Sequence, residues 1–262
     1  MIRVGVFGAG GRMGATVCRA VVEAPDLELV AAVDPFHAGT ELAALGVDGT
    51  GVRVAPNADA LAAAGAEVAV DFTVIDAARA NLRWCAARGM HAVVGTTGFS
   101  DDELAELATL FAGSAANAVI APNFAIGAVL MMRFAEQAAP HFESVEIIEM
   151  HHERKVDAPS GTAIATAQRI AAASKDWLED PTQKVIAEGA RGSTVAGVPV
   201  HALRVRGMVA SQEVLFGTTG QSLSIRHDTF DRSSFMPGVL LAVRKVAATP
   251  GLTVGLDRLL DA

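Results

Sequence analysis

The chain opens on a glycine-rich turn that constrains its fold more than any other segment. An apolar run at residues 2–7 leads into GAGGRMG, and a helical pattern follows at once. Glycine between a strand and a helix lets the backbone approach a pyrophosphate, which then lies on the helix N-terminal amides. Met13 breaks the G-x-G-x-x-G spacing, and the glycines at 8, 11 and 14 fit G-x-x-G-x-x-G instead. This turn favours a dinucleotide site over an ordinary tight turn.

An acidic residue supports the same interpretation. Asp34 closes the second apolar strand, twenty residues after Gly14, where a carboxylate can accept hydrogen bonds from ribose hydroxyls. Asp34 would repel a 2′-phosphate and so favours NADH, whereas Arg12 on the glycine turn leaves NADPH open. The cofactor-binding candidates here are Gly8, Ala9, Gly10, Gly11, Arg12, Met13 and Asp34.

The rest of the first half alternates apolar strands with helices. Such strands lack polar alternation, as a parallel sheet covered on both faces requires. Two later strands end in small or hydroxylated residues that could line the nicotinamide-ribose half of a cofactor, although ordinary turns use the same residues. These further candidates are Gly95, Thr96, Thr97, Ala121, Pro122, Asn123 and Phe124.

The pattern changes after about residue 124. Two helical segments and several turn-bounded strands with looser alternation predict a sheet with antiparallel pairs. The helical run at 235–248 resembles the helices of the first half, so we expect the chain to return there. We therefore predict an α/β protein with a Rossmann-type doubly wound parallel sheet and a second α+β domain with a mixed, largely antiparallel sheet. The predicted domains are 1–122 with 233–262, which binds the dinucleotide, and 123–232, which binds substrate.

Composition excludes several classes of protein. The 21 basic and 29 acidic residues give a net charge of −8, which disfavours a nucleic-acid partner. No run of about 18 strongly apolar residues predicts a membrane span, and the N-terminus does not resemble a leader sequence. Cys18 and Cys85 lack metal-ligand spacing and are expected to be buried free thiols. We expect a cytoplasmic enzyme without a metal.

The segment EMHHERKVDAPSGTA, residues 149–163, concentrates chemically active side chains. A zinc motif H-E-x-x-H starting at His152 would need histidine at 156, where Val156 stands. Adjacent histidines on a strand also point to opposite sides, so His151 and His152 cannot easily share an ion. Ser160 lies outside the G-x-S-x-G context of a hydrolase nucleophile.

A helix start explains this segment better. Ser160 is a good N-cap, and the backbone N–H groups of Gly161 and Thr162 would then face a carboxylate at the helix N-terminus. Lys155 supplies a cation, and a histidine can move a proton near neutral pH. A solvated loop is the alternative. With a nicotinamide site, these residues indicate reduction of a carboxylate-bearing substrate, without deciding which histidine is the acid.

Five segments in order, GAGGRMG, DFT, GTTG, APNFA and EMHHERKVDAPSGTA, resemble the 4-hydroxy-tetrahydrodipicolinate reductase (dihydrodipicolinate reductase) family. The resemblance covers essentially the whole chain, and the last segment is the most specific. It implies NADH- or NADPH-dependent reduction of 4-hydroxy-tetrahydrodipicolinate to tetrahydrodipicolinate with loss of water, in the diaminopimelate route to lysine.

The resemblance also implies roles for individual residues. His151 is expected to be the acid that protonates C3 after hydride reaches C4, and Lys155 to bind carboxylate and assist proton donation. His152, Gly161 and Thr162 fall on substrate-binding positions, and Arg232 is a candidate for the substrate dicarboxylate. A homotetramer is expected through the sheet of the second domain, between about residues 143 and 227.

Two other functions fit part of the sequence. An aspartate or diaminopimelate dehydrogenase would share the first domain, but is not expected to carry the H-H-x-x-K…S-G-T block. A dinucleotide-sensing regulator would not need His151 and Lys155, and the chain shows no basic recognition helix.

Overall fold

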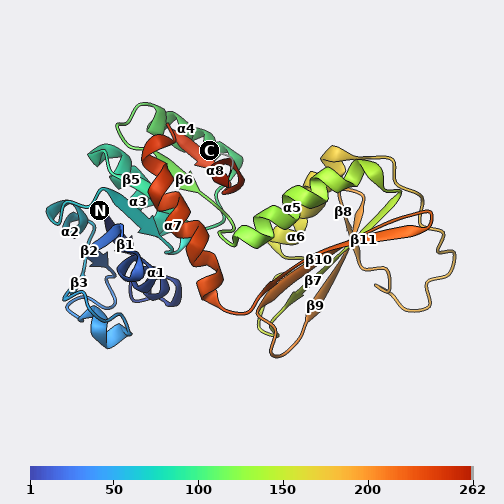
Figure 1. The fold of residues 1–262 in the computed structure, drawn as a ribbon, viewed down its shortest axis with the longest axis horizontal. Coiled ribbons are helices and arrows are strands. Elements are labelled where there is room, and N and C mark those ends of the chain that lie inside the picture. Colours follow the sequence, from blue (N-terminus) through green and yellow to red (C-terminus); the bar gives the residue numbers. More distant parts are fainter. Residues whose placement is uncertain (261–262) are drawn as a thin grey trace. The chain divides into compact units, whose positions relative to one another are not determined.

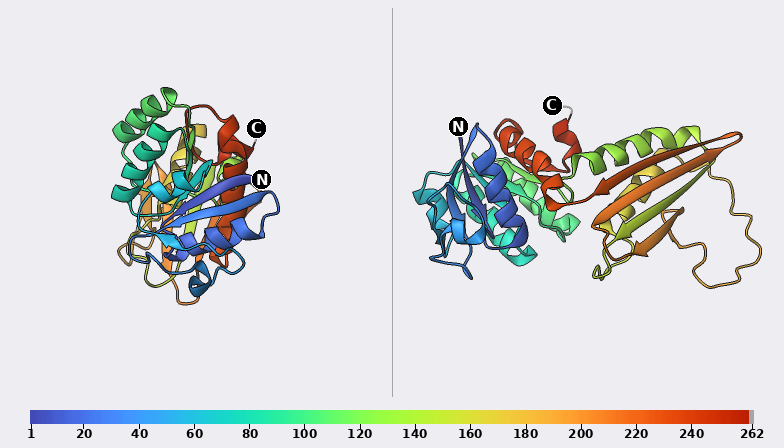
Figure 2. Two further views of the ribbon diagram at one scale, coloured as in Figure 1. Left: turned by 90° about the vertical axis from the view of Figure 1, so that its left-hand side faces the viewer. Right: turned by 60° about the horizontal axis from the view of Figure 1, so that its bottom comes forward.

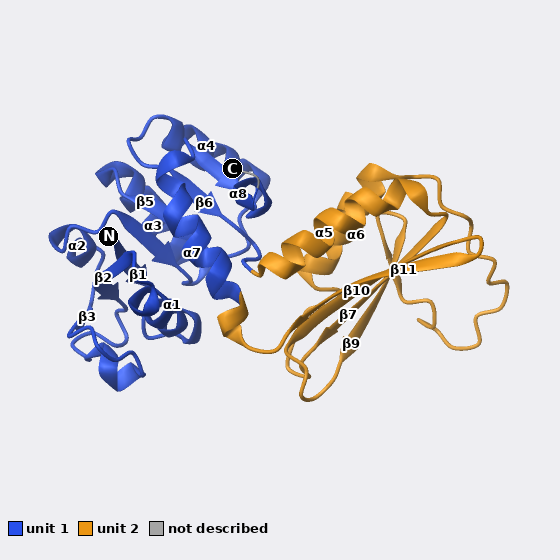
Figure 3. Ribbon diagram, in the orientation of Figure 1, with its two compact units in different colours: residues 1–124, 235–262 blue, residues 125–234 orange. Residues whose placement is uncertain are grey.

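The computed structural model describes residues 1–260, which form two compact units (Figures 1 and 3). Unit 1 takes in residues 1–124 and the described part of 235–262, and unit 2 takes in residues 125–234. The boundaries expected from the sequence lie two residues earlier in each case. The chain thus leaves unit 1 after its sixth strand and returns to it for the last helices.

Unit 1 contains a seven-stranded sheet in the order β12-β6-β5-β4-β1-β2-β3, and all its strand pairs are parallel. The strands are β1 (Ile2–Phe7), β2 (Leu27–Val33), β3 (Val54–Ala55), β4 (Val68–Asp71), β5 (His91–Val94), β6 (Ala118–Ile120) and β12 (Leu252–Val254). The central strands are apolar because both of their faces are covered: Val4, Val6 and Val70 have no exposed surface. The predicted doubly wound fold is confirmed.

Helices cover both faces of this sheet (Figure 2, left). Helix α1 (Arg12–Glu23) contacts α7 (Met236–Lys245), and α3 (Ile75–Arg88) contacts α4 (Asp101–Ala112). The acids that open α4 complete a capping box: Ser100 Oγ accepts a bond from Glu103 N at 3.2 Å, and Glu103 Oε2 accepts one from Ser100 N at 2.8 Å. The short segments are η1 (Leu42–Leu45), α2 (Asp59–Ala63), η4 (Val246–Ala248) and α8 (Asp257–Leu260).

Unit 2 contains a five-stranded sheet in the order β11-β10-β7-β9-β8. Its strands are β7 (Ser144–His151), β8 (Ser193–Val195), β9 (Val198–Arg204), β10 (Ala210–Thr218) and β11 (Gln221–Thr229). Only β7 and β9 run parallel among the paired strands of this unit, and the other pairs are antiparallel. The predicted mixed, largely antiparallel sheet is confirmed.

One face of the second sheet packs against α5 (Ile126–Ala138) and α6 (Gly161–Ala173) (Figure 1). Val145, Ile147 and Glu149 alternate along β7 and are buried on this face. Helix α6 begins where the sequence predicts, because Ser160 Oγ accepts a hydrogen bond from Ala163 N at 3.2 Å. Such an N-cap contributes about 1 kcal/mol. Two further 3₁₀ turns belong to the chain, η2 (Ala139–His141) and η3 (Arg232–Phe235).

Candidate active site

The cofactor candidates of unit 1 gather at one edge of its sheet. Neighbouring parallel strands have their carboxyl ends at the same edge, where open α/β sheets bind ligands. The glycine turn follows β1, Asp34 follows β2, and Gly95–Thr97 and Ala121–Phe124 follow β5 and β6. Because the ends of β1, β2, β5 and β6 lie at this edge, the segments that carry the predicted cofactor residues lie there as well.

The glycine turn needs glycine at two positions for different reasons. Gly8 has φ +71°, a backbone conformation that other residues rarely adopt. A Cβ on Gly14 would lie 2.0 Å from the Gly8 carbonyl oxygen, so the first turn of α1 approaches the turn too closely for any side chain. Gly11 N donates to the same carbonyl at 2.9 Å. The positions that require glycine are thus 8 and 14, and Met13 lies at neither of them.

Asp34 is buried and holds the glycine turn through its carboxylate. Its Oδ2 accepts a hydrogen bond from Gly10 N at 3.1 Å, and its Oδ1 accepts one from Phe36 N at 2.9 Å. His37 Nδ1 lies 3.2 Å from Oδ1, and its ring occupies the space that a Cβ on Gly10 would need. Asp34 was predicted from the sequence but His37 was not, because its only signal is an imidazole three residues beyond the acid.

A pocket of about 460 Å³ lies beside this carboxylate, entirely within unit 1. Its walls come from the glycine turn, the end of β2, the loop before α2 and the start of α3, with Asp34, Phe36 and Phe72 among them. An acidic group at one end and apolar walls suit the ribose and base of a dinucleotide. The residues present therefore fit the adenosine half of the cofactor.

Asp71, at the end of β4, organises the neighbouring D-F-T turn. Its Oδ1 accepts hydrogen bonds from Thr73 N at 2.7 Å and Thr73 Oγ1 at 2.6 Å, and its Oδ2 accepts one from Asn81 Nδ2 at 2.7 Å. Burial raises the pKa of this carboxyl, against the hydrogen bonds that lower it. Asp71 was not predicted as a site residue, and the D-F-T segment entered only through the family resemblance. Asp71 could have been selected from the sequence because it is an acidic residue at the end of an apolar strand.

The three loops after β4, β5 and β6 support one another. Thr96 Oγ1 donates to the Thr73 carbonyl at 2.8 Å. Gly95 leaves room for the Phe72 ring, which would lie 2.0 Å from a Cβ there. The Phe72 ring packs against Phe124, with 5.7 Å between centroids. Because Phe124 is buried, we expect its contribution to cofactor binding to come from its backbone and from packing.

In unit 2, the candidate acid is bonded to a buried carboxylate. His151 Nδ1 lies 2.5 Å from Glu149 Oε2, and Glu149 has no exposed surface. Arg204 binds the same carboxylate with both terminal nitrogens, at 3.0 and 2.9 Å, and Ser160 N donates to Oε1 at 3.1 Å. Glu149 thus joins the end of β7, the end of β9 and the N-cap of α6.

These contacts fix the chemical form of His151. A carboxylate only accepts hydrogen bonds, so Nδ1 must carry hydrogen and Nε2 is the nitrogen that can exchange a proton with a substrate. Burial lowers the pKa of His151, Glu149 acts to raise it, and Lys155 and Arg204 lower it further. The net direction is downward from the ordinary histidine value.

Lys155 lies in the loop between β7 and α6. Its Nζ contacts both carboxylate oxygens of Asp157, at 2.7 and 2.8 Å. The hydrogen bond from Lys155 is the main reason that the pKa of Asp157 is lowered. His152 is exposed, and a Cβ on Gly161 would meet no atom within 4 Å, so there is open space at the start of α6.

The remaining candidate, Arg232, lies in η3 at the end of unit 2 and is exposed. The structure shows no contact between Arg232 and His151 or Lys155, so its role stays a prediction. Sequence reasoning missed Glu149 and Arg204. Glu149 could have been found because residues two apart on a strand share a face, which pairs it with His151.

Two absences apply to residues 1–260. No three His, Cys, Asp or Glu side chains in this range lie close enough to hold one metal ion. No helix in the same range is long and apolar enough to cross a bilayer. Cys18 and Cys85 are buried free thiols, as expected, and burial raises the pKa of each to about 12.

Together the parallel sheet with its glycine turn and the second unit with its histidine, lysine and helix start define a class, the two-unit dinucleotide-dependent oxidoreductases. Comparison with known proteins narrows the class. A model of the N-terminal part of dihydrodipicolinate reductase matches residues 2–124, and a model of its C-terminal part matches residues 127–260. The chain belongs to the dihydrodipicolinate reductase family.

Individual relatives agree with this over their full length. The chain is 52% identical over 262 residues to 4-hydroxy-tetrahydrodipicolinate reductase of Mycobacterium sp. (strain KMS), which covers 99% of each chain. It is 50% identical over 264 residues to the Streptomyces coelicolor enzyme of that name, covering 99% of this chain and 98% of the other. A solved dipicolinate-bound dihydrodipicolinate reductase from Paenisporosarcina sp. TG-14 is 39% identical, with a TM-score of 0.87, and covers 98% of this chain and 99% of the other.

Proposed function

We propose that the chain reduces 4-hydroxy-tetrahydrodipicolinate to tetrahydrodipicolinate, with loss of water, in lysine biosynthesis through diaminopimelate. The observation that carries this proposal is that relatives at 50–52% identity, matched over 98–99% of their length, bear the name of this reductase. The dipicolinate bound to the Paenisporosarcina enzyme supports a small cyclic dicarboxylate as the ligand. The site described above contains the groups that such a reaction requires.

His151 is the proton donor in this proposal. When bound, the dihydronicotinamide would supply a hydride to C4 of the ring once the 4-hydroxyl has left as water, and the resulting enamine-like form of the substrate would need a proton at C3. His151 delivers that proton from Nε2, since Nδ1 is committed to Glu149.

Lys155 and the start of α6 bind the carboxylates of the substrate. The Lys155 ammonium already contacts a carboxylate, that of Asp157, and a substrate carboxylate would take over part of that contact. Gly161 leaves open space at the helix N-terminus, where backbone amides and the helix dipole favour an anion. His152, Thr162 and Arg232 complete the proposed substrate contacts.

For the cofactor, we propose that NADH and NADPH are both used and that NADH is mildly preferred. The Asp34 carboxylate favours a free ribose 2′-hydroxyl over a phosphate. His37, 3.2 Å from that carboxylate, and Arg12 on the glycine turn are the nearby groups that can carry positive charge against a phosphate. This proposal is supported by the Asp34 carboxylate, by His37 beside it, and by Arg12 on the glycine turn.

We further propose a homotetramer built on the helix-free face of the second sheet. Ile148, Met150, Leu203 and Leu215 form an apolar stripe on this face, and Leu203 is 38% exposed. Leu203→Asp should therefore dissociate the assembly. Sedimentation equilibrium of the wild-type protein at micromolar concentration should give four times the chain mass, and a monomer there would contradict the proposal.

A coupled assay tests the proposed reaction. The synthase that condenses aspartate semialdehyde with pyruvate generates the unstable substrate in the cuvette, and absorbance at the dihydronicotinamide band follows its reduction. We expect oxidation of NADH, and of NADPH at a lower kcat/KM, only when both synthase substrates are present. Absence of oxidation with either cofactor would contradict the assignment.

A further inference from the structure

Glu149 is a buried carboxylate that contacts three separate segments of unit 2. It has no exposed surface, lies two residues before the acid on β7, and its two oxygens contact four nitrogen atoms from three residues. The proposed reaction assigns no role to a protein carboxylate beside His151. A buried carboxylate is costly unless it is paired, so its partners must account for its presence.

Each partner of Glu149 belongs to a different part of the site. Oε2 faces His151 Nδ1 at 2.5 Å, and Oε1 accepts the N–H of Ser160, the residue that caps α6, at 3.1 Å. One carboxylate therefore sets the distance between the proton donor and the helix start that faces the substrate. Arg204 closes the arrangement by also donating to the Asp157 carbonyl at 2.6 Å, which fixes the loop that carries Lys155.

The charges around His151 oppose one another. The charged groups facing it are Glu149 on its own strand, Arg204 on β9 and Lys155 on the following loop, while its partner on β10 is Ala210. Glu149 favours the imidazolium, and the two cations disfavour it. Arg204 thus opposes the effect of Glu149 on the imidazole, while burial is the largest cause of the lowered pKa of His151.

We infer that Glu149 and Arg204 are positioning residues for the reduction. Glu149 orients His151 with Nε2 available to the substrate, and Arg204 keeps the charge of Glu149 from holding the proton too tightly. This inference rests on the proposed function, because it assigns His151 the role of acid. It adds two residues that touch neither substrate nor cofactor.

The two residues have opposite effects on the same imidazole, which provides the test. Glu149→Gln removes a negative charge and leaves Arg204 unbalanced, so the pKa of His151 should fall. Arg204→Met leaves Glu149 unbalanced, so the pKa of His151 should rise. A merely structural role would give both variants the same loss of stability and no opposite shifts.

NMR titration of the histidine ring signals in the unliganded protein measures the pKa of His151 without relying on activity. The His151 signal is assigned as the one that is missing from the spectrum of His151→Gln. Opposite pKa shifts in Glu149→Gln and Arg204→Met support the inference. Shifts in one direction, or no shift, overturn it. If the wild-type protein fails to oxidise either cofactor in the coupled assay, the proposed function is wrong, whereas the titration still decides whether Glu149 and Arg204 govern His151.

Kinetics provide the second readout. In Glu149→Gln, kcat should fall at least about tenfold at pH 8 with KM changed less, and the loss should shrink at pH 6, where more of the imidazole is protonated. Glu149→Asp, which keeps the charge, should retain more activity than Glu149→Gln. Equal kcat in Glu149→Gln and the wild type across this pH range would overturn the inference.

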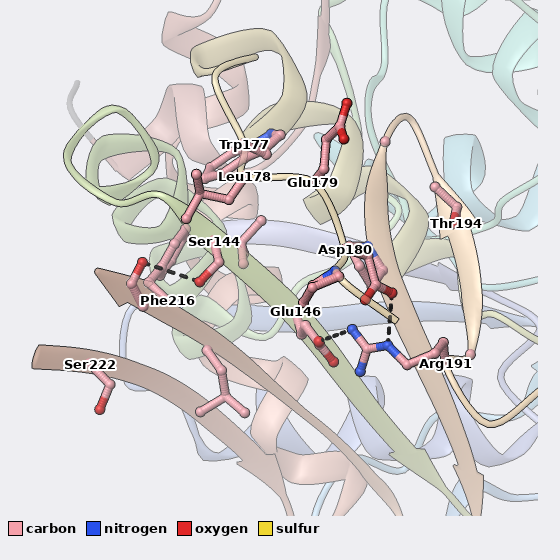
Figure 4. A pocket seen from close by; sticks show the side chains of 17 residues that line it. Ser144, Glu146, Trp177, Leu178, Glu179, Asp180, Arg191, Thr194, Phe216 and Ser222 are labelled. Carbon is pink, nitrogen blue, oxygen red and sulfur yellow. Dashed lines mark hydrogen bonds and ion pairs between the residues drawn. The ribbon is translucent and has the colours of Figure 1, made fainter. Parts of the chain in front are cut away.

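Glu146→Gln is the matched control. Glu146 lies on the same strand but on the opposite face, where it accepts hydrogen bonds from Arg191 at 2.5 Å and from His201 at 2.7 Å. Figure 4 shows Glu146 facing Arg191, with Asp180 on the other side of the guanidinium. This variant removes the same charge from a similar Arg and His pair, and should leave the His151 titration and kcat unchanged. Sedimentation should confirm that its assembly matches the wild type.

Either single variant could fail to fold, because each leaves a poorly hydrated charge without its partner. The double variant Glu149→Gln/Arg204→Met removes both charges and avoids that problem. It should fold, bind NADH normally and still show a reduced kcat with an altered pH profile. A double variant with wild-type kcat and pH profile would overturn the inference.

Discussion

Three buried acids of this chain perform the same local task, which is to hold a loop by accepting a backbone hydrogen bond. Asp34 accepts from Gly10, Asp71 from Thr73 and Glu149 from Ser160. The glycine turn, the D-F-T turn and the start of α6 are all segments to which we assign ligand contacts or their support. A carboxylate that binds an amide in this way preorganises the loop before a ligand arrives.

Asp34→Asn tests which ribose the site prefers. The change removes the negative charge and keeps an oxygen that can accept the Gly10 hydrogen bond. NADH should bind on the order of tenfold more weakly, because hydrogen bonds to a charged group contribute about 1.5–3 kcal/mol. NADPH should be affected less, since repulsion of its phosphate is relieved. Fluorescence titration measures both dissociation constants, and equal losses would mean that Asp34 does not contact the ribose.

Lys155→Ala tests the proposed carboxylate contact. Removing the ammonium should raise KM for the substrate about tenfold or more and lower kcat as well, because the charge both binds and polarises. Arg154→Ala is the control, since its side chain is 87% exposed and carries the same charge one residue away. Steady-state kinetics in the coupled assay compare the two. Equal effects would show that only net charge matters.

The residues that could be selected from the sequence are those that lie in short segments with a recognisable pattern. Asp34 and Lys155 were selected from the spacing within local segments, whereas the family resemblance, and not the spacing, chose His151 over His152 as the expected acid. Arg204 could not be found in this way, because it lies 55 positions from Glu149 along the chain and meets it only through the pairing of β7 with β9. The role of His37 likewise depends on the path of the chain after β2.

At the scale of the elements, long periodic segments were predicted to within a few residues. Helix α6 was expected to start beside a capping Ser160, and it is found at Gly161–Ala173. The strands β3, β8 and β12 were not predicted, because two or three residues are too few to show a period. They lie at or beside the edges of the sheets, where neighbouring strands rather than local sequence define them.

Gly14→Ala tests the close approach of α1 to the glycine turn. The added Cβ would lie 2.0 Å from the Gly8 carbonyl oxygen, so backbone must move. We expect a loss of about 1–3 kcal/mol of stability and weaker NADH binding. Gly113→Ala is the control, because its Cβ would lie 3.8 Å from the nearest carbonyl. Thermal unfolding and NADH titration should separate the two, and equal behaviour would contradict the proposed contact.

At the scale of the whole molecule, the proposed chemistry is divided between two units. Unit 1 carries the candidate dinucleotide residues, and unit 2 carries the proposed proton donor and the proposed anion-binding residues. The return of the chain to unit 1 was predictable, because the helical run from residue 235 shares the pattern of the first half. The order of the strands in each sheet was not, because strand order depends on contacts distant in sequence.

The central claim is that His151 donates the proton that completes the reduction. In the coupled assay, His151→Gln should lower kcat about 100-fold or more with a smaller change in KM, while NADH binding measured by fluorescence stays normal. His152→Gln, by contrast, should act mainly on KM. We expect this difference between the two adjacent histidines. A His151→Gln enzyme with near-normal kcat would contradict it.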